Sequence, residues 1–177
     1  MLDKSSPYTA AAISNYFIAK NQKEFANLTH LKLQKLLYFA QGWFMANYNM
    51  QLFNEGFEAW RLGPVVRSIY RELSGMGSNC IVNKINTVYA DTDGKPAYGP
   101  PEIEDGDAVT KSFLDTFWRL YSPIDAMALS RETHREGGPW HQVYTLYGQS
   151  LPYGVEIPID SVHKYFLGLK KSNELVN

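Results

Sequence analysis

The stretch of sequence that decides the fold is residues 28–43, LTHLKLQKLLYFAQGW. Its apolar side chains recur with the 3.6-residue spacing of one helix face, which predicts a helix packed against a core. This stripe consists of Leu33, Leu36, Leu37, Ala40, Trp43 and Phe44. Three polar residues lie off the stripe and are expected to face water: Lys32, Lys35 and Gln41. Thr29 or Asn27 can cap the helix start by accepting an amide hydrogen bond.

Other segments also have helical spacing, and they lie between glycine and proline breaks. We expect helices at about 8–20, after Pro7, and at 65–73, 107–121, 124–135, 140–147 and from Asp160 onward. A short strand at 53–61 is expected to end at the turn Gly63-Pro64, and 152–158 is irregular or an edge strand. The sequence therefore predicts a mainly α (α+β) fold, one compact domain of about six helices over 1–177.

The middle of the chain, residues 78–106, differs in character from the helical segments. It contains β-branched residues and Asp93-Gly94, a strong signal for a hairpin turn. We expect a loop or a small β excursion here. The polar residues 170–177 are expected to form a frayed tail.

Composition limits the classes of function. The chain has 177 residues, of which 45% are hydrophobic, so it can bury a core without cross-links. Its 17 Lys and Arg balance 18 Asp and Glu, which argues against nucleic acid as a partner. The single cysteine, Cys80, excludes an internal disulfide and suits a reducing compartment. No apolar run approaches the roughly 20 residues that span a bilayer, so we expect a soluble cytoplasmic protein without a membrane partner.

Catalytic and metal-binding patterns are weak. His134 and His141 are separated by Gly137-Gly138-Pro139, so one continuous helix does not bring them together. Cys80 has no neighbouring histidine, and the phosphate-binding glycine motifs are absent from the sequence. We therefore expect no catalytic residues, no metal and no cofactor. The simplest role for His134 is to close a helix C-terminus.

Aromatic and arginine residues beside the predicted turns suit a protein interface. Trp, Tyr and Arg are enriched among residues that dominate binding energy. The candidates for partner binding are Trp60, Arg61, Arg67, Tyr70, Trp140, Tyr144 and Tyr147. For the two tryptophans, burial in the core is the simpler expectation. For Arg61, Arg67, Tyr144 and Tyr147, the structural and the partner-facing roles both stay open.

Three motifs, in this order and spacing, resemble the Panacea domain of SocA-like antitoxins and their phage-associated GepA-like relatives. They are LKLQKLLY at 31–38, Ala59-Trp60 with Gly63-Pro64-Val65, and Leu129-Ser130 with Thr133-His134 and Pro139-Trp140. The resemblance is strongest over 28–147, although Gly137-Gly138 lengthens the turn before Pro139. The motif residues expected to hold the fold are Leu33, Leu36, Leu37, Gly63, Pro64, Thr133 and His134.

The resemblance implies an antitoxin of a bacterial or phage type II toxin–antitoxin system that neutralises a cognate protein toxin by direct binding. It also implies candidate partners, namely a toxic alarmone synthetase or another inhibitor of translation or growth. Two alternatives stay open: an adaptor that delivers the toxin to a protease, and a DNA-binding autoregulator of its own operon.

Overall fold

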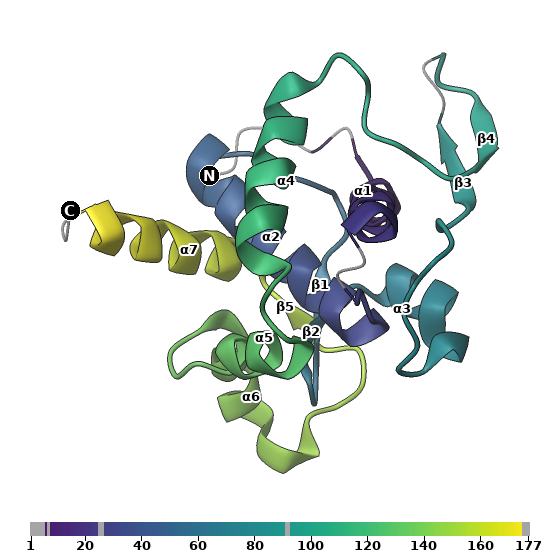
Figure 1. The fold of residues 1–177 in the computed structure, drawn as a ribbon. Coiled ribbons are helices and arrows are strands. Elements are labelled where there is room, and N and C mark those ends of the chain that lie inside the picture. Colours follow the sequence, from purple (N-terminus) through teal and green to yellow (C-terminus); the bar gives the residue numbers. More distant parts are fainter. Residues whose placement is uncertain (1–5, 7, 25–26, 91–92, 175–177) are drawn as a thin grey trace.

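The computed structural model describes residues 6, 8–24, 27–90 and 93–174, and shows a mainly helical domain with two small sheets (Figure 1). In this part of the chain, the α-helices number seven rather than about six. They are α1 (Ala10–Glu24), α2 (His30–Tyr48), α3 (Arg67–Leu73), α4 (Ala108–Tyr121), α5 (Ala126–Thr133), α6 (Pro139–Tyr147) and α7 (Ile159–Glu174). The single compact, mainly α domain predicted from the sequence is confirmed.

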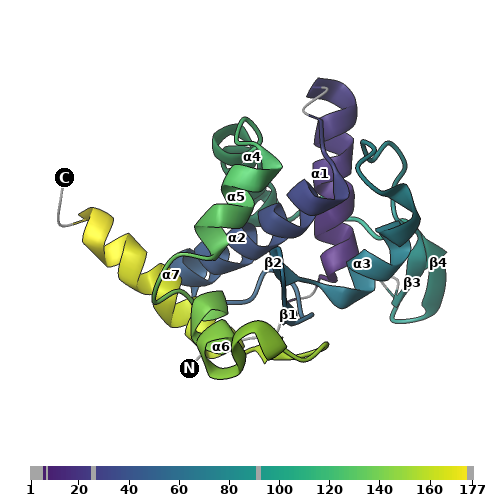
Figure 2. The same ribbon diagram turned by 90° about the horizontal axis from the view of Figure 1, so that it is seen from below.

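Helix α2 is the central element of the fold. It contacts α1, α3, α4, α5, α7 and the strand β2 (Gly63–Val65), and it runs through the middle of the molecule in Figure 1 and Figure 2. Its start is capped by Thr29, whose side chain accepts a hydrogen bond from the amide of Lys32. Its end is closed by Asn49 in the left-handed conformation, with φ 55°. The predicted helix and its Thr29 cap are therefore present.

The prediction that Lys32, Lys35 and Gln41 face water is wrong. Lys35 and Gln41 are fully buried, and Lys32 is 6% exposed. Other elements pack on most sides of α2, so a single apolar stripe does not describe its buried surface. The polar side chains are used instead to bind backbone groups: the Gln41 amide bridges residues 52 and 53, and the Lys32 ammonium donates to the carbonyl of Ser122.

A three-stranded antiparallel sheet lies against α2. Its order is β2–β1–β5, with β1 at Phe57–Trp60 and β5 at Glu156–Ile157. Trp60 pairs with Gly63, so the hairpin turn is Arg61-Leu62. The prediction of Gly63-Pro64 as the turn is therefore wrong: these residues begin β2, and the helix that follows starts at Arg67. The edge strand within 152–158 is present as β5.

The middle segment forms a separate hairpin, as the Asp93-Gly94 signal predicted. Strand β3 (Thr87–Ala90) pairs with β4 (Pro96–Gly99), and Val88 faces Tyr98 across the pair. This hairpin projects from the side of the molecule that carries α3 (Figure 1). Two 3₁₀ turns, η1 (Ser74–Met76) and η2 (Gly148–Ser150), follow α3 and α6.

The ends of two helices differ from the predicted ends. The first helix begins at Ala10, whose amide donates to the Glu55 carboxylate, and Pro7 lies outside the described residues. Asp160 lies inside the first turn of α7 rather than capping it. The predicted frayed tail is helical through Glu174, and residues 175–177 lie outside the described residues. Helix α7 extends further because it packs along α2, where Lys170 donates to the carbonyl of Ala46.

The core closes where α7 crosses α2. The buried ring of Phe166 packs edge-on against Tyr38 and Phe39, with centroids 5.7 and 6.0 Å apart. Gly42 allows this approach, because a Cβ atom there would lie 2.3 Å from the Phe166 ring. The absence of a side chain at one position of α2 therefore sets how closely α7 docks.

Replacing Gly42 with alanine is expected to destabilise the protein by about 1–3 kcal/mol, the usual cost of overpacking a core. Gly168→Ala is the matched control, because Gly168 is exposed in α7 and its added Cβ would meet nothing within 4 Å. The control should gain about 0.5–1 kcal/mol from helix propensity. Urea unfolding measures both, and equal effects would contradict the close packing.

Candidate partner-binding groove

The three sequence motifs meet around the β1–β2 hairpin. Five backbone carbonyls between Trp60 and Val66 accept hydrogen bonds from side chains of other elements. The five contacts are Trp140 Nε1 to Trp60 O (2.8 Å), His134 Nε2 to Arg61 O (3.1 Å), Ser130 Oγ to Leu62 O (2.8 Å), Lys35 Nζ to Pro64 O (2.8 Å) and Gln34 Nε2 to Val66 O (3.3 Å). The donors come from α2, from α5 with its C-cap, and from α6, so the motifs fix one short hairpin from three directions.

Gly63 lies where these motifs come closest. Its φ is +98°, and a Cβ atom would lie 2.3 Å from Thr133 Oγ1 and 2.9 Å from Lys35 Nζ. Thr133 Oγ1 itself donates to the carbonyl of Ser130 at 2.6 Å, so the hydroxyl has a fixed position. Only glycine fits both the backbone conformation and the space at this point.

His134 occupies the C-cap position of α5, and both of its ring nitrogens face carbonyl oxygens. Nδ1 lies 2.6 Å from Ser130 O, and Nε2 lies 3.1 Å from Arg61 O. The ring also packs edge-on against Trp140, with centroids 3.9 Å apart. His134 thus joins the end of α5 to the hairpin and to α6.

Lys35 is the most deeply buried ionisable group in this cluster. Its side chain is fully buried, and burial lowers the pKa of its ammonium group from 10.5 to about 7. The Pro64 carbonyl, at 2.8 Å, is its hydrogen-bond acceptor. The buried residues Leu33, Leu36 and Leu37 lie on the same helix and form the adjoining core.

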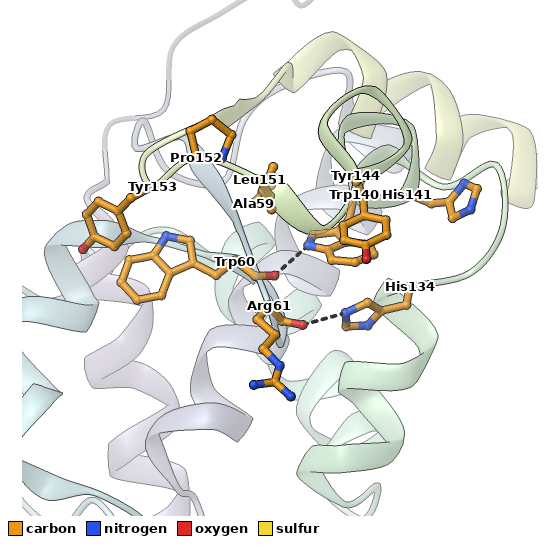
Figure 3. Close-up of a pocket in the computed structure, with 11 residues that line it drawn as sticks. Ala59, Trp60, Arg61, His134, Trp140, His141, Tyr144, Leu151, Pro152 and Tyr153 are labelled. Atoms are coloured by element: carbon orange, nitrogen blue, oxygen red, sulfur yellow. Dashed lines mark hydrogen bonds between the residues drawn. The ribbon is translucent and has the colours of Figure 1, made fainter.

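A groove of about 920 Å³ opens beside the hairpin (Figure 3). Its lining residues come from β1 and its turn, from α5 and α6, and from the loop before β5: Ala59, Trp60, Arg61, His134, Trp140, His141, Tyr144, Gly148, Leu151, Pro152 and Tyr153. Two aromatic pairs form much of its walls. Trp60 contacts Tyr153 with centroids 4.8 Å apart, and Trp140 stacks on Tyr144 at 4.8 Å and 12°.

Four of the seven predicted partner-binding residues line this groove: Trp60, Arg61, Trp140 and Tyr144. Trp140 is only 5% exposed, whereas Trp60 is half-buried. Tyr70 and Arg67 do not line the groove but contact two residues that do: the Tyr70 ring contacts Trp60 at 4.5 Å, and the Arg67 guanidinium lies over Tyr153 at 4.7 Å. Tyr147 is exposed on α6 but is not part of the lining.

The sequence interpretation missed the wall formed by residues 151–153. Tyr153 is 66% exposed and completes the aromatic surface beside Trp60. The pairing of β5 with β1 brings this loop to the groove, since Phe57 pairs with Ile157 and the amide of Ala59 donates to the carbonyl of Val155. The only signal in the sequence was an apolar, proline-bounded segment, which does not reveal its pairing partner.

Candidate catalytic and metal-binding residues do not gather in the described residues. No group of three or more His, Cys, Asp and Glu side chains that could hold a metal ion occurs among them. Cys80 lies away from the groove, where its backbone bridges to Thr29 and its sulfur accepts from the Asn21 amide. No described helix is long and apolar enough to cross a membrane.

The fold and groove define a helical scaffold that presents a fixed hairpin beside an aromatic surface. A family model for the SocA-like antitoxin, Panacea domain, matches residues 33–141, and the chain belongs to this family. Antitoxin SocA of Caulobacter vibrioides (strain NA1000 / CB15N) is 32% identical over 148 residues, which cover 84% of this chain and 77% of that protein. No solved structure gives a significant match. The resemblance identified from the three motifs is therefore confirmed.

Gly63→Ala is expected to destabilise the protein by about 2–5 kcal/mol. The variant combines the cost of a left-handed backbone, about 1–2 kcal/mol, with overpacking against Thr133 and Lys35. Gly94→Ala is the control, since Gly94 also has a positive φ (+76°) but an open environment. The control should lose only the backbone cost. Chemical unfolding compares the two, and equal losses would show that the close contact at Gly63 contributes nothing.

Lys35→Met is expected to flatten the dependence of stability on pH between 7 and about 10. The folded chain releases the Lys35 proton near pH 7, whereas the unfolded chain keeps it until about 10.5. The unfolded state therefore binds more protons in this window, and raising the pH stabilises the wild type by up to about 1.4 kcal/mol per pH unit. Urea unfolding of both proteins at pH 7 and pH 9 measures the difference. A difference between the two proteins that stays constant with pH would contradict the lowered pKa.

Proposed function

We propose that this chain is the antitoxin of a type II toxin–antitoxin pair and neutralises its cognate protein toxin by direct binding, without catalysis. The aromatic groove beside the β1–β2 hairpin is the proposed contact surface. The observation that carries this proposal is that the family motifs position a hairpin and two aromatic pairs around an open groove. Trp, Tyr and Arg in such a setting are the residues that dominate protein interfaces.

The groove combines a part shared with the family and a part outside the matched range. Trp60, Arg61, His134, Trp140 and His141 lie within residues 33–141, whereas Tyr144 and the lining residues of 148–153 lie beyond them. This division suits a protein whose common scaffold meets different toxins. We infer that the wall formed by 144–153 adapts the shared platform to one particular toxin, a cytoplasmic inhibitor of translation or growth.

Two aromatic residues of this wall provide the direct test. Tyr144→Ala combined with Tyr153→Ala should weaken binding of the toxin encoded beside this gene by about 30-fold or more, the effect of losing about 2 kcal/mol at an interface hot spot. Cells expressing the toxin should then no longer be rescued. Co-purification and growth of co-expressing cells measure the two effects.

Tyr98→Ala is the matched control, because Tyr98 is 77% exposed on β4, far from α6 in Figure 1. This variant should neutralise like the wild type. If the wild-type chain fails to protect cells from the toxin, the proposed function is wrong. Toxin that disappears only when a protease is present would instead favour the adaptor mechanism, and toxin half-life with and without this chain separates the two.

A further inference from the structure

The described lining of the groove contains basic side chains and no acidic ones. Its ionisable lining side chains other than tyrosine are Arg61, His134 and His141, and no Asp or Glu occurs among the described residues that line it. The carboxylate of Glu58, which precedes the lining residue Ala59 on β1, is buried and already accepts hydrogen bonds from Trp60 Nε1 at 2.8 Å and Arg67 Nη1 at 3.1 Å. Because the whole chain has a net charge of −1, this local absence of acids is not a consequence of composition.

Arg61 is the cation that this arrangement offers to a partner. It lies at the exposed turn of the hairpin, and its backbone carbonyl is held by His134 while the next carbonyl is held by Ser130. No carboxylate of the described residues forms an ion pair with its guanidinium. Because the backbone at this turn is held by hydrogen bonds, less entropy is lost when a partner binds. The planar guanidinium recognises carboxylates through paired hydrogen bonds.

The aromatic walls offer apolar faces rather than polar edges. The indole N–H of Trp60 donates to Glu58, and that of Trp140 donates to the Trp60 carbonyl. Their polar ends are thus satisfied within the protein. Figure 3 shows Trp60 and Tyr153 on one side of the groove and Trp140 and Tyr144 on the other. A large apolar side chain inserted between these pairs would bury its surface against Trp60, Tyr153 and Tyr144, since Trp140 is already covered by its neighbours.

The geometry points to an acidic segment of the toxin as the occupant of the groove, with one carboxylate paired to Arg61 and one large apolar side chain between the two aromatic pairs. This inference deepens the proposed function and rests on it. A polypeptide fits better than a nucleic acid, because phosphate backbones are bound by several Lys and Arg side chains. The groove offers one arginine and no lysine.

Charge reversal tests the pairing of Arg61 with the toxin. Arg61→Glu should weaken toxin binding at least about tenfold, since like charges then meet at the contact. Arg119→Glu makes the same change in net charge at an exposed position of α4 that does not line the groove, and it should bind like the wild type. Thermal unfolding confirms that both variants fold. Equal binding of Arg61→Glu and wild type would overturn the inference and leave the proposed function standing.

Photo-crosslinking identifies the occupant itself. With p-benzoylphenylalanine in place of Tyr153, the complex purified from co-expressing cells should yield a toxin peptide rich in Asp and Glu that contains a large apolar residue. The same group in place of Tyr98, on the remote β3–β4 hairpin, should not label that peptide. A basic or neutral peptide, a crosslinked nucleic acid, or no toxin peptide would each overturn the inference. A wild-type chain that binds no toxin would remove the proposed function together with the inference.

Discussion

The structure depends on how the backbone carbonyls of one short hairpin are satisfied. Residues 60–66 form a hairpin whose carbonyls accept from side chains on α2, on α5 and its C-cap, and on α6. A buried backbone acceptor without a partner costs about 1–3 kcal/mol, so the donors to the buried residues Pro64 and Val66 remove a penalty as well as fixing a position. The hairpin is thereby anchored to all three helical elements. This explains why the Panacea motifs lie far apart in sequence yet act at one place.

Holding the hairpin in this way requires the burial of an ammonium group, that of Lys35. A buried ammonium group is normally matched with a carboxylate, but here its acceptor is the carbonyl of Pro64. Burial therefore lowers its pKa to about 7, so the protonated and neutral forms of the group have similar free energies near neutral pH. Its closeness to Gly63 leaves no space for a side chain at position 63. The buried position of the Lys35 ammonium group therefore depends on glycine at position 63.

Hydrogen bonds within the protein fix the two tryptophan rings beside the groove. The indole N–H groups of Trp60 and Trp140 are used within the protein, so the groove presents the rings of Trp60, Tyr144 and Tyr153 and the side chain of Arg61. Much of the specificity of an interface comes from such preorganised anchors rather than from its area. The family match ends at residue 141, while the groove continues through the loop at 151–153. The groove therefore includes residues inside the matched range and residues beyond it.

The sequence by itself determined the central helix with its Thr29 cap, the mainly helical class, the β3–β4 hairpin and the family, because these follow from local periodicity, capping and ordered motifs. It also marked Trp60, Arg61, Trp140 and Tyr144, which the fold brings into one groove. Only the tertiary structure decided that Lys35 and Gln41 are buried and that Gly63-Pro64 is a strand rather than a turn. It also decided that Tyr153 joins the groove. The reason is physical: helical spacing reports one buried face, whereas α2 is covered on most sides, and the pairing of β5 with β1 joins residues about 100 positions apart, whose contact no local pattern encodes.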